Sequence, residues 1–418
     1  MRKRFWWIWS FKGVTRWFAL MLLGLLVFMG AIISLTNRYV VNLVELSLLQ
    51  ALVLMAAGLV VAWYGGRRGF KRVVDILSPF TPVNIYDFLQ RDVRKKRGPK
   101  IVVIGGGTGL SVLLKGLKKY SSNLTAVVTV TDDGGSSGRL RGELGVLPPG
   151  DIRRCLIALA ETENLMDQVF EHRFEEGEGI RGHNLGNLLL TALTDITGDF
   201  VGAIREVSKV LAVQGQVLPA TLEQVVLGAV MEGGEVVLGE SSISAAGKTI
   251  SNVFITPPDC QPVPEAVQAI LEADAVVLGP GSLFTSILPN LLVMEIGKAV
   301  QETAATRMLV VNIMTQPGET TNFKASDHLR ALNKHIGRGF VDYAIVNDAK
   351  VDDDRLSRYR SEGAETVVAD REYFDSEGVK LVCASLLGKE DVAWHDPDSL
   401  ASAIIRTIYW RKGLIWPW

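Results

Sequence analysis

Residues 101–109 read IVVIGGGTG, four β-branched residues that run into a turn of glycines, and this stretch decides the fold. Glycine adopts positive φ angles that other residues avoid, so the pattern predicts a buried strand followed by a tight turn. The Leu-rich segment from Leu110 to Tyr120 then has the apolar spacing of an amphipathic helix. Together these residues predict the opening βαβ unit of a Rossmann-like domain.

Strand and helix patterns alternate after this unit. Helix spacing recurs at residues 152–160, 185–196, 201–213 and 326–335, and apolar strand-like runs begin at 274, 307 and 341. Residues 216–242 instead read as short strands with a turn at Gly233-Gly234, which predicts a β-rich insertion. We therefore expect an α/β fold: a doubly wound, mostly parallel sheet with a small β-rich insertion.

The N-terminal part of the chain has a different composition. Residues 17–37 and 46–66 carry no charge, and each run is long enough to span a bilayer as a helix. Short helices in a globular core are the alternative, which two tandem runs with Trp17 and Trp63 near their ends disfavour. We predict a two-span transmembrane hairpin at 1–66, a basic juxtamembrane connector at 67–99 and a nucleotide-binding domain at 100–418.

Basic residues cluster before the first apolar run and after the second, whereas the loop between them carries only Arg38. By the positive-inside rule, this asymmetry places the chain in the cell membrane with its large domain in the cytoplasm. Elsewhere the 44 lysines and arginines nearly balance the 45 aspartates and glutamates, which gives no support for nucleic-acid binding. Three separated cysteines indicate neither a disulfide framework nor a zinc site.

In an open parallel sheet, ligands bind beyond the carboxyl ends of the strands. Four polar segments fall at such ends: residues 105–109, 132–141, 279–282 and 315–320. The glycine turn at 105–109 departs from the GxGxxG spacing of dinucleotide sites, so either a purely structural turn or a phosphate or ribose contact fits it. A plain NAD site is disfavoured for the same reason.

The segment 132–141, DDGGSSGRLR, is the most unusual of the four. Asp132 and Asp133 suit a ribose contact or a hydrated Mg²⁺ ion, and a solvated turn is the alternative. The glycines and serines that follow can form a nest of N–H groups, and Arg139 and Arg141 suit phosphate unless they pair with the aspartates.

Two further segments carry polar groups to helix starts. Asp151 is expected to cap the helix that follows it, and one of Arg153 and Arg154 should face inward while the other faces solvent. His183 and Asn184 precede another helix, where they either serve the structure or read a base, sugar or phosphate. No nucleophile elbow and no His/Cys metal cluster is visible in the sequence.

Six motifs, in order, resemble the gluconeogenesis factor family, which is related to the 2-phospho-L-lactate transferases of deazaflavin coenzyme biosynthesis. They are GGGTGLSVLLKGLK, TVTDDGGSSGRLR, GDIRRCLIALA, GHNLGNLLL, GPGSLFTSILPNLL and TQPGET. The resemblance covers roughly residues 100–410. It implies a domain that binds a nucleotide sugar such as UDP-N-acetylglucosamine, and a role in cell shape and envelope synthesis during growth on gluconeogenic carbon sources.

Carried onto this chain, the resemblance implies a ligand-binding set at the carboxyl edge of the sheet. The set is Gly106, Gly107, Thr108, Gly109, Ser136, Ser137, Gly138, Arg139, Arg141, Asn184, Asn187, Gly281 and Ser282. The position of Arg153 and His183 at helix starts adds these two residues to the candidates. Asp132 and Asp133 are the candidates for catalysis and for Mg²⁺, the one cofactor considered. The alternative function is a Mg²⁺-dependent transferase that moves a phosphate-linked group from a nucleotide-activated donor. The expected partners are a UDP-sugar, the membrane through residues 17–66, an envelope-synthesis protein and a second copy of the chain.

Overall fold

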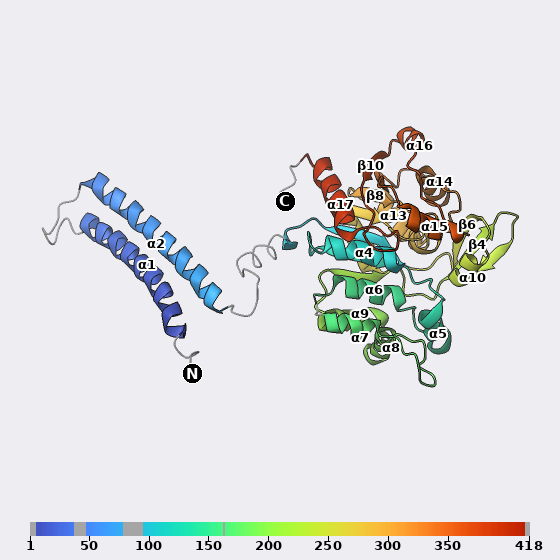
Figure 1. Ribbon diagram of the computed structural model, residues 1–418, viewed down its shortest axis with the longest axis horizontal. Helices are drawn as coiled ribbons and strands as arrows, with labels where there is room; N and C mark the ends of the chain where they lie inside the picture. The colour runs from blue at the N-terminus through green and yellow to red at the C-terminus, as the bar shows by residue number, and fades with distance from the viewer. Residues whose placement is uncertain (1–5, 37–46, 78–94, 162–163, 414–418) are drawn as a thin grey trace. The chain divides into compact units, whose positions relative to one another are not determined.

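The computed structural model describes residues 6–36, 47–77, 95–161 and 164–413. The chain divides into two compact units, Met1–Val93 and Arg94–Trp418, which are drawn together in Figure 1. Each unit has its own internal packing and is described by itself.

The first unit is a pair of long helices, α1 (Trp6–Thr36) and α2 (Leu48–Leu77). Its apolar parts, Thr15–Leu35 and Leu48–Arg72, are long and apolar enough to cross a membrane. The two helices approach at Gly24, where an added Cβ would lie 2.4 Å from the backbone nitrogen of Ala62. Such close contact of small residues is a common way for helices to pack in lipid, because hydrocarbon gives apolar side chains no reason to turn inward. Large apolar side chains accordingly point outward, for example Leu26, which is 65% exposed.

One end of this hairpin carries a cluster of aromatic and arginine side chains. The Arg68 guanidinium lies over the rings of Trp17 and Tyr64, 5.5 and 5.4 Å from their centroids. Arg67 lies 5.3 Å from the centroid of Trp63. Aromatic and basic side chains of this kind concentrate at membrane–water interfaces, so the cluster marks the end of the hairpin that suits a headgroup region.

The second unit is built on a seven-stranded sheet in the order β10-β9-β8-β7-β1-β2-β3, with every neighbouring pair parallel. Its strands are β1 (Ile101–Gly105), β2 (Leu124–Val128), β3 (Gln216–Pro219), β7 (Ala275–Leu278), β8 (Thr306–Val310), β9 (Tyr343–Asn347) and β10 (Lys380–Ala384). The central strands β1 and β7 are fully buried, as expected of apolar strands covered on both faces. The predicted doubly wound, mostly parallel sheet is confirmed.

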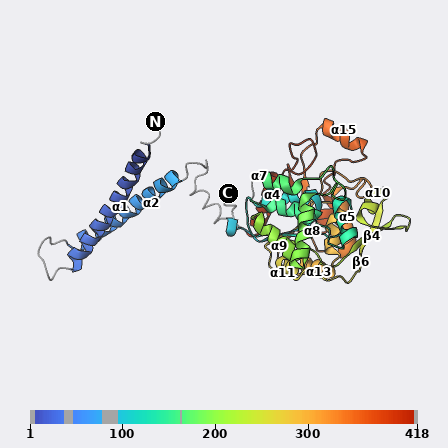
Figure 2. The same ribbon diagram turned by 90° about the horizontal axis from the view of Figure 1, so that it is seen from below.

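The helices of this unit connect the strands and cover the sheet. They are α4 (Gly107–Leu117), α5 (Gly135–Leu144), α6 (Gly150–Leu159), α7 (Asn164–Glu171), α8 (Leu185–Thr197), α9 (Phe200–Val210), α10 (Glu240–Ala245), α11 (Pro264–Leu271), the π-helical turn η1 (Leu283–Ile287), α12 (Leu288–Leu291), α13 (Met294–Glu302), α14 (Ala325–Ile336), α15 (Asp353–Ser361), α16 (Glu372–Ser376) and α17 (Pro397–Arg411). Helix α4 packs against α6 and α17, and α11 packs against α13. Figure 2 shows α11 and α13 on one side of the unit and α15 on the other.

The contact between α4 and α17 depends on a glycine. An added Cβ at Gly116 would lie 1.9 Å from the carbonyl oxygen of Pro397, so the helices meet backbone to backbone. Pro397 is at the start of α17, and the side chain of Asp396 accepts a hydrogen bond from the Ser399 N–H. Asp396 therefore caps this helix and Pro397 opens it, where its fixed φ angle suits the first turn.

The β-rich insertion is a three-stranded antiparallel sheet of β5 (Val236–Leu238), β4 (Val226–Met231) and β6 (Ile250–Thr256). It projects with α10 from one end of the unit in Figures 1 and 2. The prediction placed residues 216–219 in this insertion, and that detail was wrong because β3 pairs in parallel with β2. Only the tertiary pairing distinguishes a short edge strand of one sheet from the first strand of another.

The strand order reverses between β1 and β7. From β1 the chain adds β2 and then β3 on one side, and β7 returns to the other side of β1 before β8, β9 and β10 follow. Connections that leave adjacent strands in opposite directions open a crevice beyond their carboxyl ends. The glycine segments at 105–109 and 279–282 follow these two strands, so the topology places them beside each other at that crevice.

Candidate functional site

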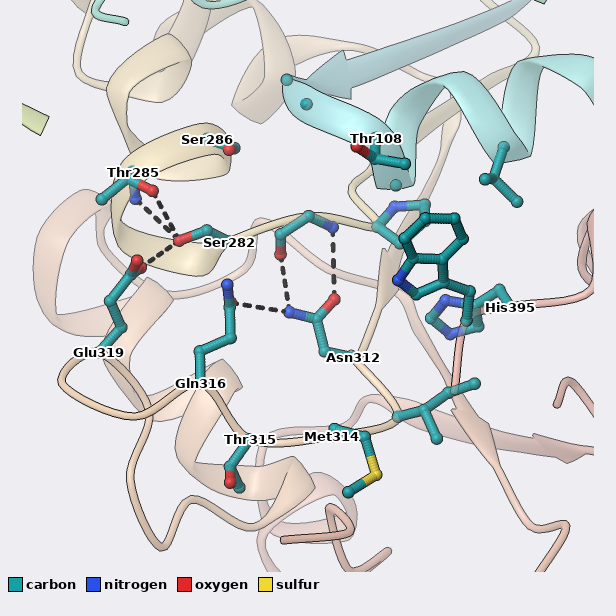
Figure 3. A pocket seen from close by; sticks show the side chains of 18 of the residues that line it. Thr108, Ser282, Thr285, Ser286, Asn312, Met314, Thr315, Gln316, Glu319 and His395 are labelled. Atoms are coloured by element: carbon teal, nitrogen blue, oxygen red, sulfur yellow. Dashed lines mark hydrogen bonds between the residues drawn. The ribbon is translucent and has the colours of Figure 1, made fainter. Parts of the chain in front are cut away.

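A cavity of about 450 Å³ opens at the crevice beyond β1, β7 and β8 (Figure 3). Its lining comes from the start of α4, the turn after β7, the segment after β8, the insertion and the residues before α17. The lining residues used below are Gly106, Gly107, Thr108, Gly109, Glu240, Ser244, Gly281, Ser282, Asn312, Gln316, Glu319, Tyr359, Trp394 and His395. Six of the predicted ligand residues therefore lie in one cavity.

The first wall of this cavity is the glycine turn after β1. Gly106 is the N-cap of α4 and has no side chain, so the start of the helix is open to the cavity. Gly107 has φ +69°, which explains a glycine at this position. Its N–H donates a 2.6 Å hydrogen bond to Oδ2 of Asp151.

Asp151 therefore has a different role from the predicted one. The N-cap of α6 is Pro149, and Asp151 lies in the first turn of that helix, so the predicted capping role was wrong. Its two carboxylate oxygens instead join two elements, because Oδ1 accepts a 2.6 Å hydrogen bond from Arg154 of α6 while Oδ2 accepts the amide of the glycine turn. The helix can begin earlier because Pro149 and Gly150 already suit its start.

The second wall is the turn after β7, held by side chains that follow β8. Asn312 accepts the Gly281 N–H at 3.3 Å and donates to the Gly281 carbonyl at 3.0 Å, so one amide fixes both polar groups of the turn. Ser282 caps the π-helical turn, and its hydroxyl donates to the Glu319 carboxylate. Figure 3 shows these contacts on the side of the cavity opposite His395.

The third wall is aromatic and comes from far along the chain. Tyr359 lies on α15, and Trp394 and His395 precede α17. Trp394 is 46% exposed, and His395 is buried with no partner for its Nε2. Burial lowers the pKa of His395 to about 4, so its ring is neutral at physiological pH. The other ring nitrogen bonds the Val311 backbone, which raises the pKa, so Nε2 is left as a hydrogen-bond acceptor.

Two acidic side chains line this cavity. Glu240 and Glu319 line it, and among the described residues no lysine or arginine does. Burial, followed by the charges of Asp132 and Asp151, raises the pKa of Glu240 to about 9, and burial raises the pKa of Glu319 as well. Glu240 is therefore a neutral carboxylic acid near pH 7, able to donate a hydrogen bond to a ligand.

Asp132 and Asp133 lie beside this cavity without lining it. Asp132 accepts the Gly134 N–H at 3.0 Å, and Asp133 accepts the Ser241 N–H of α10 at 2.8 Å. Burial raises the pKa of Asp132, and the charge of Asp151 adds to that effect. Within the described ranges, no group of three or more His, Cys, Asp or Glu side chains is arranged for a metal. A role of Asp132 and Asp133 as magnesium ligands therefore stays a prediction.

The rest of the predicted phosphate loop is bonded to the protein itself. The Ser136 hydroxyl lies 2.9 Å from Nδ1 of His183 and accepts a 3.0 Å hydrogen bond from Asn187, and all three side chains are buried. Ser137 accepts the Gly150 N–H at 3.1 Å. These contacts tie the start of α5 to α8 and α6.

The two arginines of this loop also have protein partners. Arg141 donates a 2.5 Å hydrogen bond to the Val225 carbonyl, and Arg139 donates a 2.8 Å hydrogen bond to the Arg181 carbonyl. Gly138 packs against the backbone of Asp133, whose carbonyl oxygen would lie 1.9 Å from an added Cβ. None of these residues lines the cavity at β1 and β7, and their contact with a ligand stays a prediction.

Arg153 and Asn184 lie in a second cavity, of about 660 Å³, on the other side of the aromatic wall. The two cavities share Thr108, Val112, Trp394 and His395. Arg153 is 6% exposed, as expected of an inward-facing arginine. Arg154 does not simply face solvent, because its side chain is 37% exposed, bonds to Asp151 and lines the same cavity.

Sequence reasoning missed part of the first cavity. Glu240, Asn312, Tyr359, Trp394 and His395 were not among the predicted ligand residues. Asn312 follows the strand run 306–310 directly, which was a usable signal because polar residues at strand ends meet at the ligand edge. The other four lie on insertions or late segments whose position depends on tertiary packing.

Comparison with known proteins finds a family match over residues 101–387, to the family described as 2-phospho-L-lactate transferase CofD. The gluconeogenesis factor of Bacillus subtilis is 50% identical over 73% of this chain and 97% of its own length. A putative gluconeogenesis factor of Nostoc is 44% identical over 92% of this chain and 83% of its own length, so that match extends into the N-terminal unit. A crystal structure of a Bacillus halodurans protein superposes with a TM-score of 0.72 at 49% identity, covering 74% of this chain and 99% of that one.

Proposed function

Because the chain belongs to the CofD family that includes the gluconeogenesis factors, we propose that it binds a nucleoside diphosphate sugar, such as UDP-N-acetylglucosamine, as a regulatory protein. One observation carries the proposal: the cavity at the β1–β7 reversal combines two glycine turns, amide side chains and an aromatic wall. Glycine turns at helix starts suit phosphate, amides suit sugar hydroxyls or a base edge, and an aromatic ring suits a base.

The residues divide naturally between the parts of such a ligand. The open start of α4 and the turn after β7 would face the diphosphate. Glu240, neutral near pH 7, would donate a hydrogen bond to a phosphate or hydroxyl oxygen. Trp394 and Tyr359 would contact the base, and Asn312 and Gln316, which are joined by a 3.2 Å hydrogen bond, would orient the sugar.

Calorimetry on the full-length protein in detergent, titrated with UDP-N-acetylglucosamine, tests the proposal. We expect saturable binding and a loss of about tenfold or more in affinity for Trp394→Ala, since base–aromatic stacking contributes about 1–3 kcal/mol. Trp410→Ala is the matched control, because Trp410 is 70% exposed on α17 and does not line the cavity. Lack of binding, or equal affinity in the two variants, would contradict the proposal.

The regulatory part of the proposal concerns cell shape and envelope synthesis on gluconeogenic carbon sources. It is tested in cells that lack the gene, complemented with the wild type or with Trp394→Ala. Restored growth and shape with the wild type and with Trp410→Ala, but not with Trp394→Ala, is the expected result. Equal rescue by all three chains would show that the cellular role does not require ligand binding in this cavity.

We also propose that the first unit anchors the protein in the cell membrane with the second unit in the cytoplasm. The two apolar helices have the required length, and the arginine–aromatic cluster contains Arg67 and Arg68 of the basic stretch that the positive-inside rule places in the cytoplasm. Cysteines placed in turn at position 42 and at exposed Arg205 should be labelled from outside intact cells at 42 only. Labelling from outside at position 205 alone would show the opposite orientation. Labelling at neither position would contradict the proposed topology of the anchor.

The second candidate function is a magnesium-dependent transferase, which the grouped carboxylates favour. Burial and the charge of Asp151 raise the pKa of Asp132, and burial with the charges of Asp132 and Asp151 raises the pKa of Glu240. A bound cation would relieve this crowding of negative charge. An acceptor hydroxyl would attack the phosphorus of the transferred group, the pyrophosphate P–O bond would break, and a nucleoside monophosphate would leave as a carboxylate takes the proton.

Release of UMP or GMP from candidate donors with an alcohol acceptor, followed by mass spectrometry, tests this second function. Turnover should require Mg²⁺ and should be lost in Asp132→Asn. Turnover in the absence of an acceptor would indicate hydrolysis instead, and no release with any donor would leave binding as the function.

A further inference from the structure

Arg153 is a buried cation without acceptors for most of its donors. It lies on α6, is 6% exposed, and its Nε and Nη1 atoms have no hydrogen-bond partner. Its stem is tightly packed, since an added Cβ at Gly186 would lie 2.7 Å from the Arg153 Cδ. The guanidinium head is therefore held in place at the wall of the second cavity.

Such an arrangement is costly for the protein alone. An unpaired buried charge costs several kcal/mol. Burial, together with the charge of Arg154, lowers the pKa of Arg153 only to about 10, so the side chain stays protonated at neutral pH. The Asp151 carboxylate bonds to Arg154 and Gly107, and no hydrogen bond joins it to Nε or Nη1 of Arg153. The charge of Glu171 raises the pKa of Arg153, also without a hydrogen bond to either of these atoms.

The cavity around Arg153 differs from the first in its charge. Four cationic side chains line it: Lys115, Arg153, Arg154 and Lys389. The carboxylates on its lining are Glu171, Glu390 and Asp396, and Asp396 is occupied as the cap of α17. The first cavity, by contrast, has two carboxylates and, among the described residues, no cation.

We propose that the second cavity binds a phosphate group, with the guanidinium of Arg153 at its wall as the main donor and Arg154, Lys115 and Lys389 as supporting charges. An arginine fork matches two phosphate oxygens, and the shielded setting strengthens each charge-assisted hydrogen bond. The proposal does not depend on the function of the first cavity, because it rests on residues that line only the second.

The test is calorimetry with inorganic phosphate on the full-length protein in detergent, at constant ionic strength. Arg153→Met keeps the length and bulk of the side chain and removes its charge, so we expect phosphate affinity to fall by about tenfold or more. The same variant should unfold at a higher temperature than the wild type in phosphate-free buffer, because an unpaired buried charge has been replaced by an apolar group. Arg205→Met, at an exposed position of α9, is the matched control and should change neither quantity.

Several results would overturn the proposal. Absence of phosphate binding, or equal phosphate affinity in the wild type and Arg153→Met, would do so. A lower unfolding temperature in both Arg153→Met and Glu171→Gln, without a phosphate effect, would show that Arg153 is an internal partner of Glu171. If Arg153→Met does not fold, Arg153→Lys replaces it, because lysine keeps the charge without the guanidinium fork. Unchanged phosphate affinity in Arg153→Lys would also contradict the proposal.

A second arm identifies the source of the phosphate. If inorganic phosphate still binds after saturation with UDP-N-acetylglucosamine, the cavity serves a separate phosphorylated small molecule. If it no longer binds, the phosphate belongs to a nucleotide that extends past Thr108 from the first cavity. Failure of the nucleotide sugar to bind would contradict the proposed function above and leave the phosphate result standing.

Discussion

The glycine turn after β1 and the charged loop after β2 look equally suited to phosphate in the sequence, but the structure uses them differently. The first turn opens onto a cavity at the start of α4. In the second, Ser136, Ser137 and Arg141 are bonded to neighbouring parts of the protein. The residue types of a segment show that it can bind an anion. Whether its donors are available depends on whether they are already hydrogen-bonded to other parts of the protein.

The difference has a physical basis in what each loop must support. The loop after β2 holds α5 against α8, and buried polar groups there need partners whether or not a ligand is present. The turn after β1 needs only the freedom of glycine and one bond to Asp151. The loop after β2 should therefore respond to mutation mainly in stability, and the residues of the cavity mainly in binding.

The largest expected effect comes from Gly138→Ala in α5. The new Cβ would lie 1.9 Å from the carbonyl oxygen of Asp133, and because backbone cannot yield easily, we expect a loss of about 3 kcal/mol in unfolding free energy. Gly142→Ala in the same helix meets nothing within 4 Å and should stabilise by about 0.5–1 kcal/mol. Denaturant titration measures both, and equal effects would contradict a scaffold role for this helix.

A smaller loss is expected from Ser136→Ala. The change leaves Nδ1 of His183 and the amide of Asn187 buried without their shared partner, which should cost about 2 kcal/mol. Affinity for a UDP-sugar should stay within about twofold of the wild type. A large loss of affinity with unchanged stability would instead assign this hydroxyl to the ligand and remove the contrast between the two loops.

The smallest expected effect for a single step is the pH response of Glu240, at most about 1.4 kcal/mol of unfolding free energy for each pH unit. Its pKa is about 9 in the folded chain, above the ordinary value of 4.5 that an unfolded chain has. The folded state thus holds a proton that the unfolded state has lost, so its stabilising effect declines as the pH rises from about 4.5 to about 9. The unfolding temperature should fall less steeply between pH 6 and 9 for Glu240→Gln than for the wild type. Parallel curves of unfolding temperature against pH would contradict the raised pKa.

The sequence predicted the central part of the fold well, for identifiable reasons. Ile101 to Gly105 and Ala275 to Leu278 are apolar runs that end in glycine, and both are central strands. The glycines at 106, 107, 109 and 281 then had to lie at the same edge, because parallel strands end together. Local pattern and topology were sufficient for this half of the cavity.

The other half could not be predicted in the same way. Trp394 and His395 lie in an irregular segment that is held at the cavity by bonds to residues 386–388 and by the packing of α17 on α4. The roles of Ser136 and Arg141 depended on partners at 183, 187 and 225, which no local pattern reveals. Asp151 was misread as a cap because its actual partner, the Gly107 amide, comes from a different element.

The backbone contact between Gly116 and Pro397 also has a consequence for the order of events during synthesis. Helix α4 leaves the ribosome early, but the helix that packs against it, and the aromatic wall beside that helix, are made only near residues 394–411. The cavity consequently forms by a contact of very long sequence separation, the slow kind in folding. The two apolar helices of a nascent chain leave the ribosome long before the residues that complete the cavity are synthesised. A ligand can therefore bind only to chains whose synthesis is complete.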